Sequence, residues 1–196
     1  GLVDRSRLQP DFVHRRYLMT ANPLQAVENL CAGERFAAQP VVTHCSGVLI
    51  GADLVMTAGH CFDASHTCQD TQVIFGWQAT PAGQIPRSTD PADVYSCRRL
   101  LAHEHSGTRD YALFQLDRPA LGRAPIPMPR RSSLHQGSDV FAIGHPSGLP
   151  LKIADHAAVL GMSDEGTFTA NLDTFGGNSG SPIFNSLTLE LEGILI

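Results

Sequence analysis

The sequence has no hydrophobic run long enough to cross a membrane and no cluster of basic residues. A spanning helix needs roughly 18 consecutive apolar residues, and no run in the chain approaches that length. The 14 Lys and Arg are outnumbered by 19 Asp and Glu, and the basic residues form no block. A nucleic-acid-binding surface would need such a block. We therefore expect neither a membrane nor a nucleic acid among the partners.

The sequence also lacks the long apolar stripes of a helical bundle, any repeat of fixed period and any low-complexity segment. Hydrophobic residues make up 42% of the chain, but they occur in short runs separated by 18 Gly and 13 Pro. Such runs are typical of β-strands joined by turns. The 196 residues suffice for one sizeable core or two small ones, so we predict a globular, all-β protein.

The five cysteines form no C-x-x-C pair and no Cys/His pattern with zinc-finger spacing. Disulfides would place the protein in an oxidising compartment, either secreted or periplasmic. The alternative is a set of five buried free thiols. The first residue is Gly1 rather than Met, which suggests a mature or trimmed form without its targeting segment.

The distribution of short runs suggests two halves. Residues 1–32 mix charged residues and Pro without a lasting period, and we predict an N-terminal extension with a short helix around Leu24–Leu30. A first barrel is expected over residues 33–120, a proline-rich connection over 121–135 and a second barrel over 136–196. The expected strands are Ala37–Val42, Cys45–Ile50, Leu54–Thr57, Gln72–Trp77, Val94–Ala102, Tyr111–Leu116, Val140–Ile143, Ile153–Leu160, Thr167–Leu172, Pro182–Asn185 and Leu189–Ile196.

Three stretches carry residues suited to nucleophilic catalysis. The stretch T-A-G-H-C presents His60 after an apolar strand, and R-D-Y-A-L-F-Q-L places Asp110 at the start of another. The stretch T-F-G-G-N-S-G-S-P places Ser179 in a glycine-rich turn. In acyl transfer a histidine removes the serine proton, a buried carboxylate fixes the imidazole tautomer, and the serine attacks. Each motif alone is weak, but together they predict this chemistry.

The glycines beside the serine have a physical role of their own. Backbone N–H groups can converge on a developing oxyanion only where the chain turns sharply and no side chain blocks the substrate. We expect the N–H groups of Gly177 and Ser179 to be these two donors.

Together these motifs resemble those of the chymotrypsin-like family of two-barrel serine proteases, over roughly Phe36–Ile196. T-A-G-H-C matches the family's histidine motif and D-Y-A-L its aspartate motif, while G-N-S-G-S-P resembles the serine motif of the bacterial branch that includes glutamyl endopeptidases. The resemblance implies two six-stranded antiparallel barrels and a serine endopeptidase that acts on proteins or peptides without a cofactor. It also implies the disulfides Cys45–Cys61 and Cys68–Cys97, which leave Cys31 over.

The sequence departs from the family at its activation and specificity positions. Trypsins hold their new amino terminus with an Asp where this chain has Asn178, so activation is expected to differ. Asp173 stands where trypsins keep the carboxylate that selects Arg or Lys, although it could equally turn away and pair structurally. Thr174 is the residue type that glutamyl endopeptidases carry there, but Leu195 replaces their late histidine and argues against a preference for Glu.

The second barrel is expected to be incomplete. After Gly193 the family continues into a strand that binds the substrate backbone, whereas Ile196 is the last residue here. Either the sequence is a fragment of a longer protein or another chain supplies the missing strand. The alternative function is therefore a non-catalytic binding module, or an inactive fragment, on a protease scaffold.

Two further stretches have simpler explanations. His103 and His105 of the H-E-H stretch would share one face of a strand, but nothing in the sequence indicates the other ligands of a metal site. We expect no metal and take both histidines as exposed residues at a strand end. G-H-P-S-G-L-P, at residues 144–150, is expected to form a loop near the mouth of the second barrel, and turn chemistry explains its composition.

Overall fold

A computed structural model describes residues 1–31, 33–107, 109–129 and 131–196. Strands supply nearly all of its regular structure, which confirms the all-β prediction. None of the helices in these ranges is both long and apolar enough to span a membrane. The strands are β1 (Leu2–Asp4), β2 (Leu8–Asp11), β3 (Arg16–Met19), β4 (Asn22–Pro23), β5 (Pro40–Val41), β6 (Val48–Leu49), β7 (Leu54–Thr57), β8 (Thr71–Ile74), β9 (Ser88–Thr89), β10 (Val94–Ser106), β11 (Arg109–Leu116), β12 (Asp139–Gly144), β13 (Lys152–Met162), β14 (Phe168–Ala170), β15 (Pro182–Asn185) and β16 (Leu191–Ile194). The helical elements are α1 (Leu24–Glu28) and the 3-10 turns η1 (Arg5–Arg7), η2 (Gly59–Cys61), η3 (Pro91–Asp93) and η4 (Pro146–Gly148).

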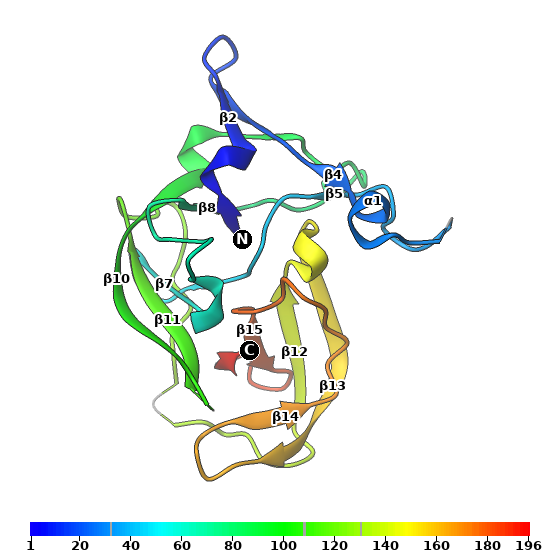
Figure 1. Ribbon diagram of the computed structural model, residues 1–196. Coiled ribbons are helices and arrows are strands. Elements are labelled where there is room, and N and C mark those ends of the chain that lie inside the picture. Colours follow the sequence, from blue (N-terminus) through cyan, green and yellow to red (C-terminus); the bar gives the residue numbers. More distant parts are fainter. Residues whose placement is uncertain (32, 108, 130) are drawn as a thin grey trace.

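The first sheet has six antiparallel strands in the order β1-β8-β10-β11-β7-β6 and curls into a barrel (Figure 1). Its two edges meet just before β6, where the N–H of Leu2 donates to the carbonyl oxygen of Cys45 at 2.8 Å. The N–H of His44 returns a hydrogen bond to the carbonyl oxygen of Leu2 at 2.9 Å. Both edges therefore find backbone partners, as buried N–H and C=O groups require.

The amino-terminal residues differ from the expectation of a separate extension. Leu2–Asp4 pair with β8 as a strand of the first sheet, and the side chains of Leu2 and Val3 are fully buried. The strand expected at Ala37–Val42 is shorter and lies outside this sheet, because β5 pairs with β4. Three residues are too few to show a period of two, and the pairing partner of β1 lies far along the chain. The predicted helix forms as α1.

The second sheet has five antiparallel strands in the order β14-β13-β12-β15-β16, as expected for an incomplete barrel. Its edge strands β14 and β16 pair with no further strand in the described part of the chain. The buried residues on its inner face are Val140, Ala142, Ala157, Val159 and Ile183. A separate cluster of Val48, Phe184 and Leu191 packs the two sheets against each other.

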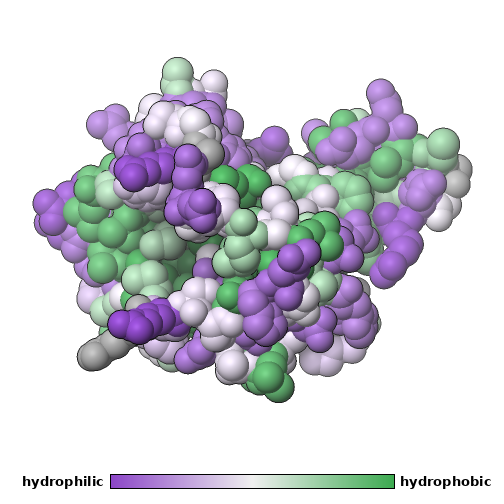
Figure 2. Space-filling view, turned by 90° about the horizontal axis from the view of Figure 1, so that it is seen from below, coloured by the Kyte–Doolittle hydropathy of each residue, from purple (hydrophilic) through white to green (hydrophobic). Residues whose placement is uncertain are grey.

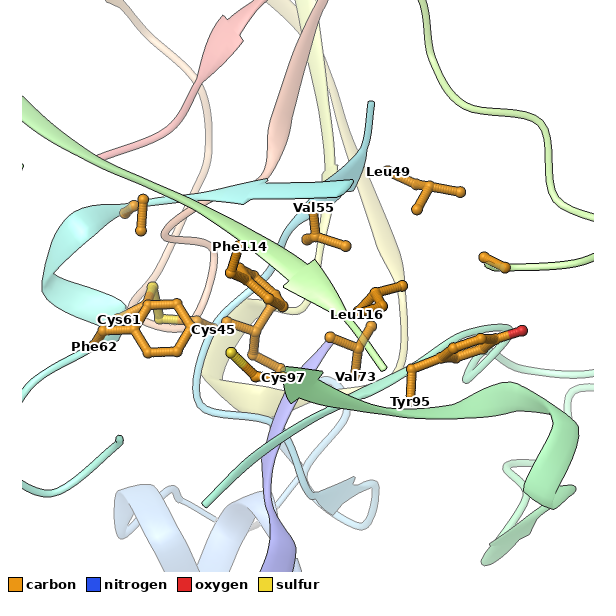
Figure 3. Close-up of a cluster of buried hydrophobic side chains, with 14 residues drawn as sticks. Cys45, Leu49, Val55, Cys61, Phe62, Val73, Tyr95, Cys97, Phe114 and Leu116 are labelled. Carbon is orange, nitrogen blue, oxygen red and sulfur yellow. A yellow bond between two sulfur atoms is a disulfide. The ribbon is translucent and has the colours of Figure 1, made fainter. Parts of the chain in front are cut away.

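The core of the first barrel is built around Phe114, which is fully buried and meets Phe62 edge to face at 5.3 Å (Figure 3). Two disulfides border this core. They join Cys45 to Cys61 and Cys68 to Cys97, and Cys31 is free and exposed, which confirms the predicted pairing.

Some apolar side chains remain on the surface of the first barrel. In the view from below, hydrophobic surface gathers on the side where β10 and β11 lie (Figure 2). Leu100, Leu101 and Tyr111 are the exposed large apolar residues of these strands.

His44 combines burial with a lack of partners. Its ring stacks on that of His66 with the centroids 4.2 Å apart, and neither ring nitrogen of His44 has a hydrogen-bond partner among the described residues. Burial disfavours the charged ring, and the nearby His66 adds to this effect. These effects outweigh the carboxylates of Asp4 and Asp63 and the smaller influence of the Cys61 backbone, and they lower the pKa of His44 from 6.5 to about 4.

Replacing Phe114 tests the core of the first barrel. We expect Phe114→Ala to lower the free energy of unfolding by about 3–5 kcal/mol, because it leaves a cavity that the packed strands cannot fill. Urea unfolding measures the change. Phe12→Ala removes the same atoms from a residue that is 86% exposed, and should cost less than about 0.5 kcal/mol. Equal losses in the two variants would contradict this core.

His44 should make the fold sensitive to acid. Between about pH 6.5 and pH 4 the unfolded chain binds a proton at this residue and the folded chain does not. The stability that the neutral His44 contributes is complete above pH 6.5. The free energy of unfolding falls by about 3 kcal/mol as the pH drops to 4. Urea unfolding across this range should show a shallower pH slope for His44→Phe than for wild type. His156→Phe, at a side chain that is 93% exposed, should keep the wild-type slope. Identical slopes for His44→Phe and wild type would disprove the assignment.

Candidate functional site

His60 lies in a short turn that is anchored by a strand on one side and by a disulfide on the other. β7 ends at Thr57, and η2 follows at once, with Cys61 tied by its disulfide to Cys45. Gly59 lets the turn lie directly against β10, because a Cβ atom there would collide with the carbonyl oxygen of Glu104. The imidazole therefore projects from a rigid support.

Asp110 orients the imidazole from the start of β11. Its Oδ1 accepts the backbone N–H of His60 at 2.8 Å, and its Oδ2 lies 2.6 Å from Nδ1 of the ring. Burial acts to raise the pKa of this carboxyl, but the hydrogen bonds from the ring and the backbone of His60 outweigh it. The pKa of Asp110 is therefore lowered from 3.8, and the group stays ionised at neutral pH.

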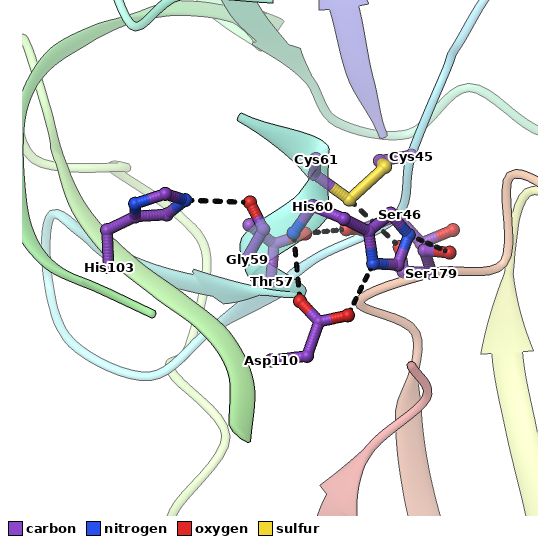
Figure 4. Close-up of polar contacts among 9 residues, drawn as sticks. All are labelled: Cys45, Ser46, Thr57, Gly59, His60, Cys61, His103, Asp110 and Ser179. Atoms are coloured by element: carbon purple, nitrogen blue, oxygen red, sulfur yellow. Dashed lines mark hydrogen bonds and ion pairs between the residues drawn. A yellow bond between two sulfur atoms is a disulfide. The ribbon is translucent and has the colours of Figure 1, made fainter. Parts of the chain in front are cut away.

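Ser179 lies in the turn before β15 of the other sheet and completes the chain of hydrogen bonds. Its Oγ lies 2.7 Å from Nε2 of His60 (Figure 4). Because the ionised Asp110 can only accept, Nδ1 carries the ring proton of the neutral imidazole and Nε2 is free to take the serine proton. The predicted trio is thus brought together in an arrangement that can activate a serine for nucleophilic attack.

The two predicted oxyanion donors are free. The N–H groups of Gly177 and Ser179 donate to no acceptor in the described ranges. In a trans peptide the C=O and N–H bonds point in opposite directions. The carbonyl oxygen of Gly176 accepts the N–H of Ser147 at 2.5 Å, so the N–H of Gly177 points away from that loop.

The same geometry orients the N–H of Ser179. The carbonyl oxygen of Asn178 accepts the N–H of Ser181 at 2.8 Å, which turns the amide of Ser179 the other way. The Asn178 side chain is buried, and its Oδ1 accepts the hydroxyl of Ser181 at 3.3 Å. The side-chain amide of Asn178 is thus bound within the turn itself.

The specificity candidates lie in different hollows. Asp173 is exposed and lines a hollow of about 360 Å³ together with Lys152 and Asn178. Thr174 and Leu195 line another hollow, of about 430 Å³, which lies between β14 and β16 and reaches Asp110. Asp173 forms no ion pair with another described residue. It therefore neither lies in the hollow beside Asp110 nor takes part in the structural pairing considered as its alternative.

Both histidines of the H-E-H stretch are exposed, as expected, but they flank the site. Nε2 of His103 lies 3.0 Å from the carbonyl oxygen of Gly59, in the turn that carries His60 (Figure 4). The ring of His105 lies 5.8 Å from that of His60, because His105 pairs with Asp110 across the β10–β11 hairpin. The sequence could have predicted this proximity, because pairing β10 with β11 as a hairpin places His105 opposite Asp110.

Sequence reasoning also missed the contacts of loop 144–150 and the role of Ser46. The loop reaches the glycine-rich turn around Ser179 (residues 174–182, the serine turn) through Ser147, whose φ is +47° and whose N–H donates to the carbonyl oxygen of Gly176. The hydroxyl of Ser46 donates to the carbonyl oxygen of Gly177 and accepts the backbone N–H of His145. No local pattern signals either contact, because each depends on how the two sheets meet.

One group of potential metal ligands lies together, namely Cys45, Cys61 and His60. The two sulfur atoms are joined in a disulfide and cannot act as thiolates. The imidazole is held between Asp110 and Ser179. These residues are therefore not suited to hold a metal ion.

Comparison with known proteins agrees with this geometry. Residues 45–194 match the protein family described as Trypsin-like peptidase domain. The chain is similar to the structure of human heparin binding protein, with 19% identity, a TM-score of 0.61, and coverage of 78% of this chain and 74% of that one. It is also similar to the structure of a serine-to-alanine mutant of Rv3671c from M. tuberculosis H37Rv in its inactive form, with 17% identity, a TM-score of 0.54, and coverage of 81% of this chain and 72% of that one. No curated protein sequence matches the chain.

Gly180 should tolerate no side chain. Its φ is +82°, and a Cβ atom would collide with Oγ1 of Thr57 and the carbonyl oxygen of Ser46. We expect Gly180→Ala to lower the free energy of unfolding by about 2–4 kcal/mol in urea titrations. Gly161→Ala is the control, because its Cβ would make only ordinary contact with Thr169 at 3.5 Å. If Gly180→Ala proved as stable as the control, the serine turn could not be packed in this way.

Proposed function

The chain belongs to the trypsin-like peptidase domain family, and we propose that it is a serine endopeptidase that forms an acyl-enzyme on Ser179. The observation that carries the proposal is the continuous set of hydrogen bonds from Asp110 through His60 to Ser179. These residues come from the first sheet and from turns attached to both sheets, so the arrangement exists only in the folded protein. The amides of Gly177 and Ser179, which donate to no acceptor in the described ranges, support the same chemistry.

The reaction follows from the positions of these groups. His60 takes the proton of Ser179 through Nε2 as Oγ attacks the carbonyl carbon of the scissile peptide bond. The carbonyl oxygen becomes an oxyanion that the N–H groups of Gly177 and Ser179 stabilise, each contributing on the order of 3 kcal/mol. The C–N bond then breaks as His60 gives its proton to the leaving amine. In the second half a water molecule attacks the acyl-enzyme carbonyl while His60 takes its proton, and the bond to Oγ breaks as His60 returns that proton to Ser179, which releases the acid.

Asp110 keeps the imidazole in the required tautomer throughout. Its ionised carboxylate faces Nδ1 and also stabilises the imidazolium that forms during each proton transfer. The backbone N–H of His60 holds the second carboxylate oxygen, so the two groups cannot rotate independently.

The substrates we propose are proteins or peptides, cleaved in an oxidising compartment outside the cytoplasm. Two disulfides support this location, because such bonds form and persist mainly in oxidising surroundings. The G-N-S-G-S-P stretch supports a place in the bacterial branch of the family. Asn178 bonds to Ser181 rather than offering a carboxylate, so we propose a route of activation that needs no ammonium partner at this position.

A second function is favoured by one observation, the open seam of the second barrel. The hollow between β14 and β16 is lined largely by apolar residues such as Phe168, Leu172 and Ile194. We propose that a further strand, from a continuation of this chain or from another chain, fills this seam. If catalysis requires that strand, the described residues alone would act as a binding module or an inactive scaffold.

Mutation of the nucleophile separates these two functions. We expect wild type to release fluorescent peptides from labelled casein, and Ser179→Ala to lower kcat by at least about 10⁴-fold, because the acyl-enzyme cannot form. Ser186→Ala, at an exposed serine, is the matched control and should retain full activity. Equal hydrolysis by wild type and Ser179→Ala would exclude Ser179 as the nucleophile. Absence of hydrolysis by wild type would favour the binding module.

A further inference from the structure

Ser46 lies where the first barrel meets the two loops that form the oxyanion site. We propose that Ser46 is a positioning residue for catalysis: its hydroxyl fixes the peptide groups around Gly177 so that the oxyanion donors point at the substrate. The inference rests on the proposed peptidase function. It assigns a role to a residue that belongs to none of the three catalytic motifs.

The backbone of Ser46 is anchored on both sides. Its N–H donates to the carbonyl oxygen of Ser179 at 2.8 Å, and its carbonyl oxygen accepts the hydroxyl of Thr57 at 2.6 Å. The residue is 1% exposed and follows Cys45, whose disulfide holds the His60 turn. Its side chain therefore leaves the first barrel from a fixed point.

The hydroxyl of Ser46 bridges the two loops. It donates to the carbonyl oxygen of Gly177 at 2.9 Å and accepts the backbone N–H of His145 at 2.9 Å. A serine hydroxyl has a single hydrogen to donate, so its donor capacity is fully used. One buried group thus connects the serine turn to the loop that begins at His145.

These bonds control the direction of the Gly177 amide. The carbonyl groups on either side of that amide are both held, the oxygen of Gly176 by Ser147 and the oxygen of Gly177 by Ser46. Ser147 lies two residues after His145, so the Ser46 hydroxyl also steadies the loop that holds Gly176. The loops are in close contact, because a Cβ atom on Gly177 would lie 2.7 Å from the carbonyl oxygen of His145.

Loss of the hydroxyl would leave two backbone groups unpaired, the buried N–H of His145 and the partly buried carbonyl oxygen of Gly177, which is more costly than the loss of one exposed bond. The loops could regain partners only by moving, and the amide of Gly177 would move with them. The hydrogen bonds of His60 with Asp110 and Ser179 do not involve this hydroxyl. The effect should therefore fall on stabilisation of the oxyanion, which lowers kcat, and less on KM.

The test compares Ser46→Ala with Ser46→Thr, which retains a hydroxyl, and with Thr43→Val. Thr43 is the matched control, because its hydroxyl is buried on the same segment and has no partner among the residues described. Peptide hydrolysis gives kcat and KM. Hydrogen exchange followed by mass spectrometry reports the backbone of residues 145–149 and 175–181 whether or not the protein is active.

We expect Ser46→Ala to lower kcat by about 10- to 100-fold with KM within about threefold, and to speed exchange in both segments. Ser46→Thr should recover most of the loss, and Thr43→Val should match wild type. Unchanged exchange in Ser46→Ala, or faster exchange with an unchanged kcat, would overturn the proposal. If wild type itself does not hydrolyse peptides, the proposed function fails. The exchange result would then still decide whether the hydroxyl holds the loops, with unchanged exchange overturning that claim.

Discussion

The hydrogen bond between Nε2 of His60 and the hydroxyl of Ser179 joins turns carried by two separate sheets, and the other features of the site preserve its length of 2.7 Å. On one side, the Cys45–Cys61 disulfide and the Asp110 carboxylate fix the imidazole. On the other, the serine turn is pressed so closely against the first barrel that Gly180 has no room for a Cβ atom. A bond that depends on two independent cores keeps its geometry only if the contact between them is rigid.

The rigidity comes from buried polar groups rather than from apolar packing alone. The apolar contact between the sheets centres on Val48, Phe184 and Leu191 and sets no direction for individual peptide groups. Direction comes from hydrogen bonds, among them those of Ser46 with Ser179, Gly177 and His145. Catalysis by preorganised amides needs this directional control, because the donors must point at the oxyanion before it forms.

The sequence predicted those parts of the site that local chemistry determines. T-A-G-H-C, D-Y-A-L and G-N-S-G-S-P each require particular residues at fixed spacing, so His60, Asp110 and Ser179 could be named in advance. The all-β class and most strands of the two halves followed from short apolar runs. What could not be predicted depends on long-range pairing: β1 joins the first sheet, Asp173 and Thr174 line separate hollows, and Ser46 bridges two loops. A single hydroxyl within an apolar strand carries no local signal for such a contact.

Covalent labelling tests most directly whether Ser179 is an activated nucleophile. A fluorophosphonate reacts with a serine only when a base accepts its proton and oxyanion donors are in place. Intact-mass spectrometry of the purified protein should show a single adduct on wild type and none on Ser179→Ala. A wild-type protein that remains unlabelled, or a Ser179→Ala variant that is labelled equally, would show that Ser179 is not an activated nucleophile.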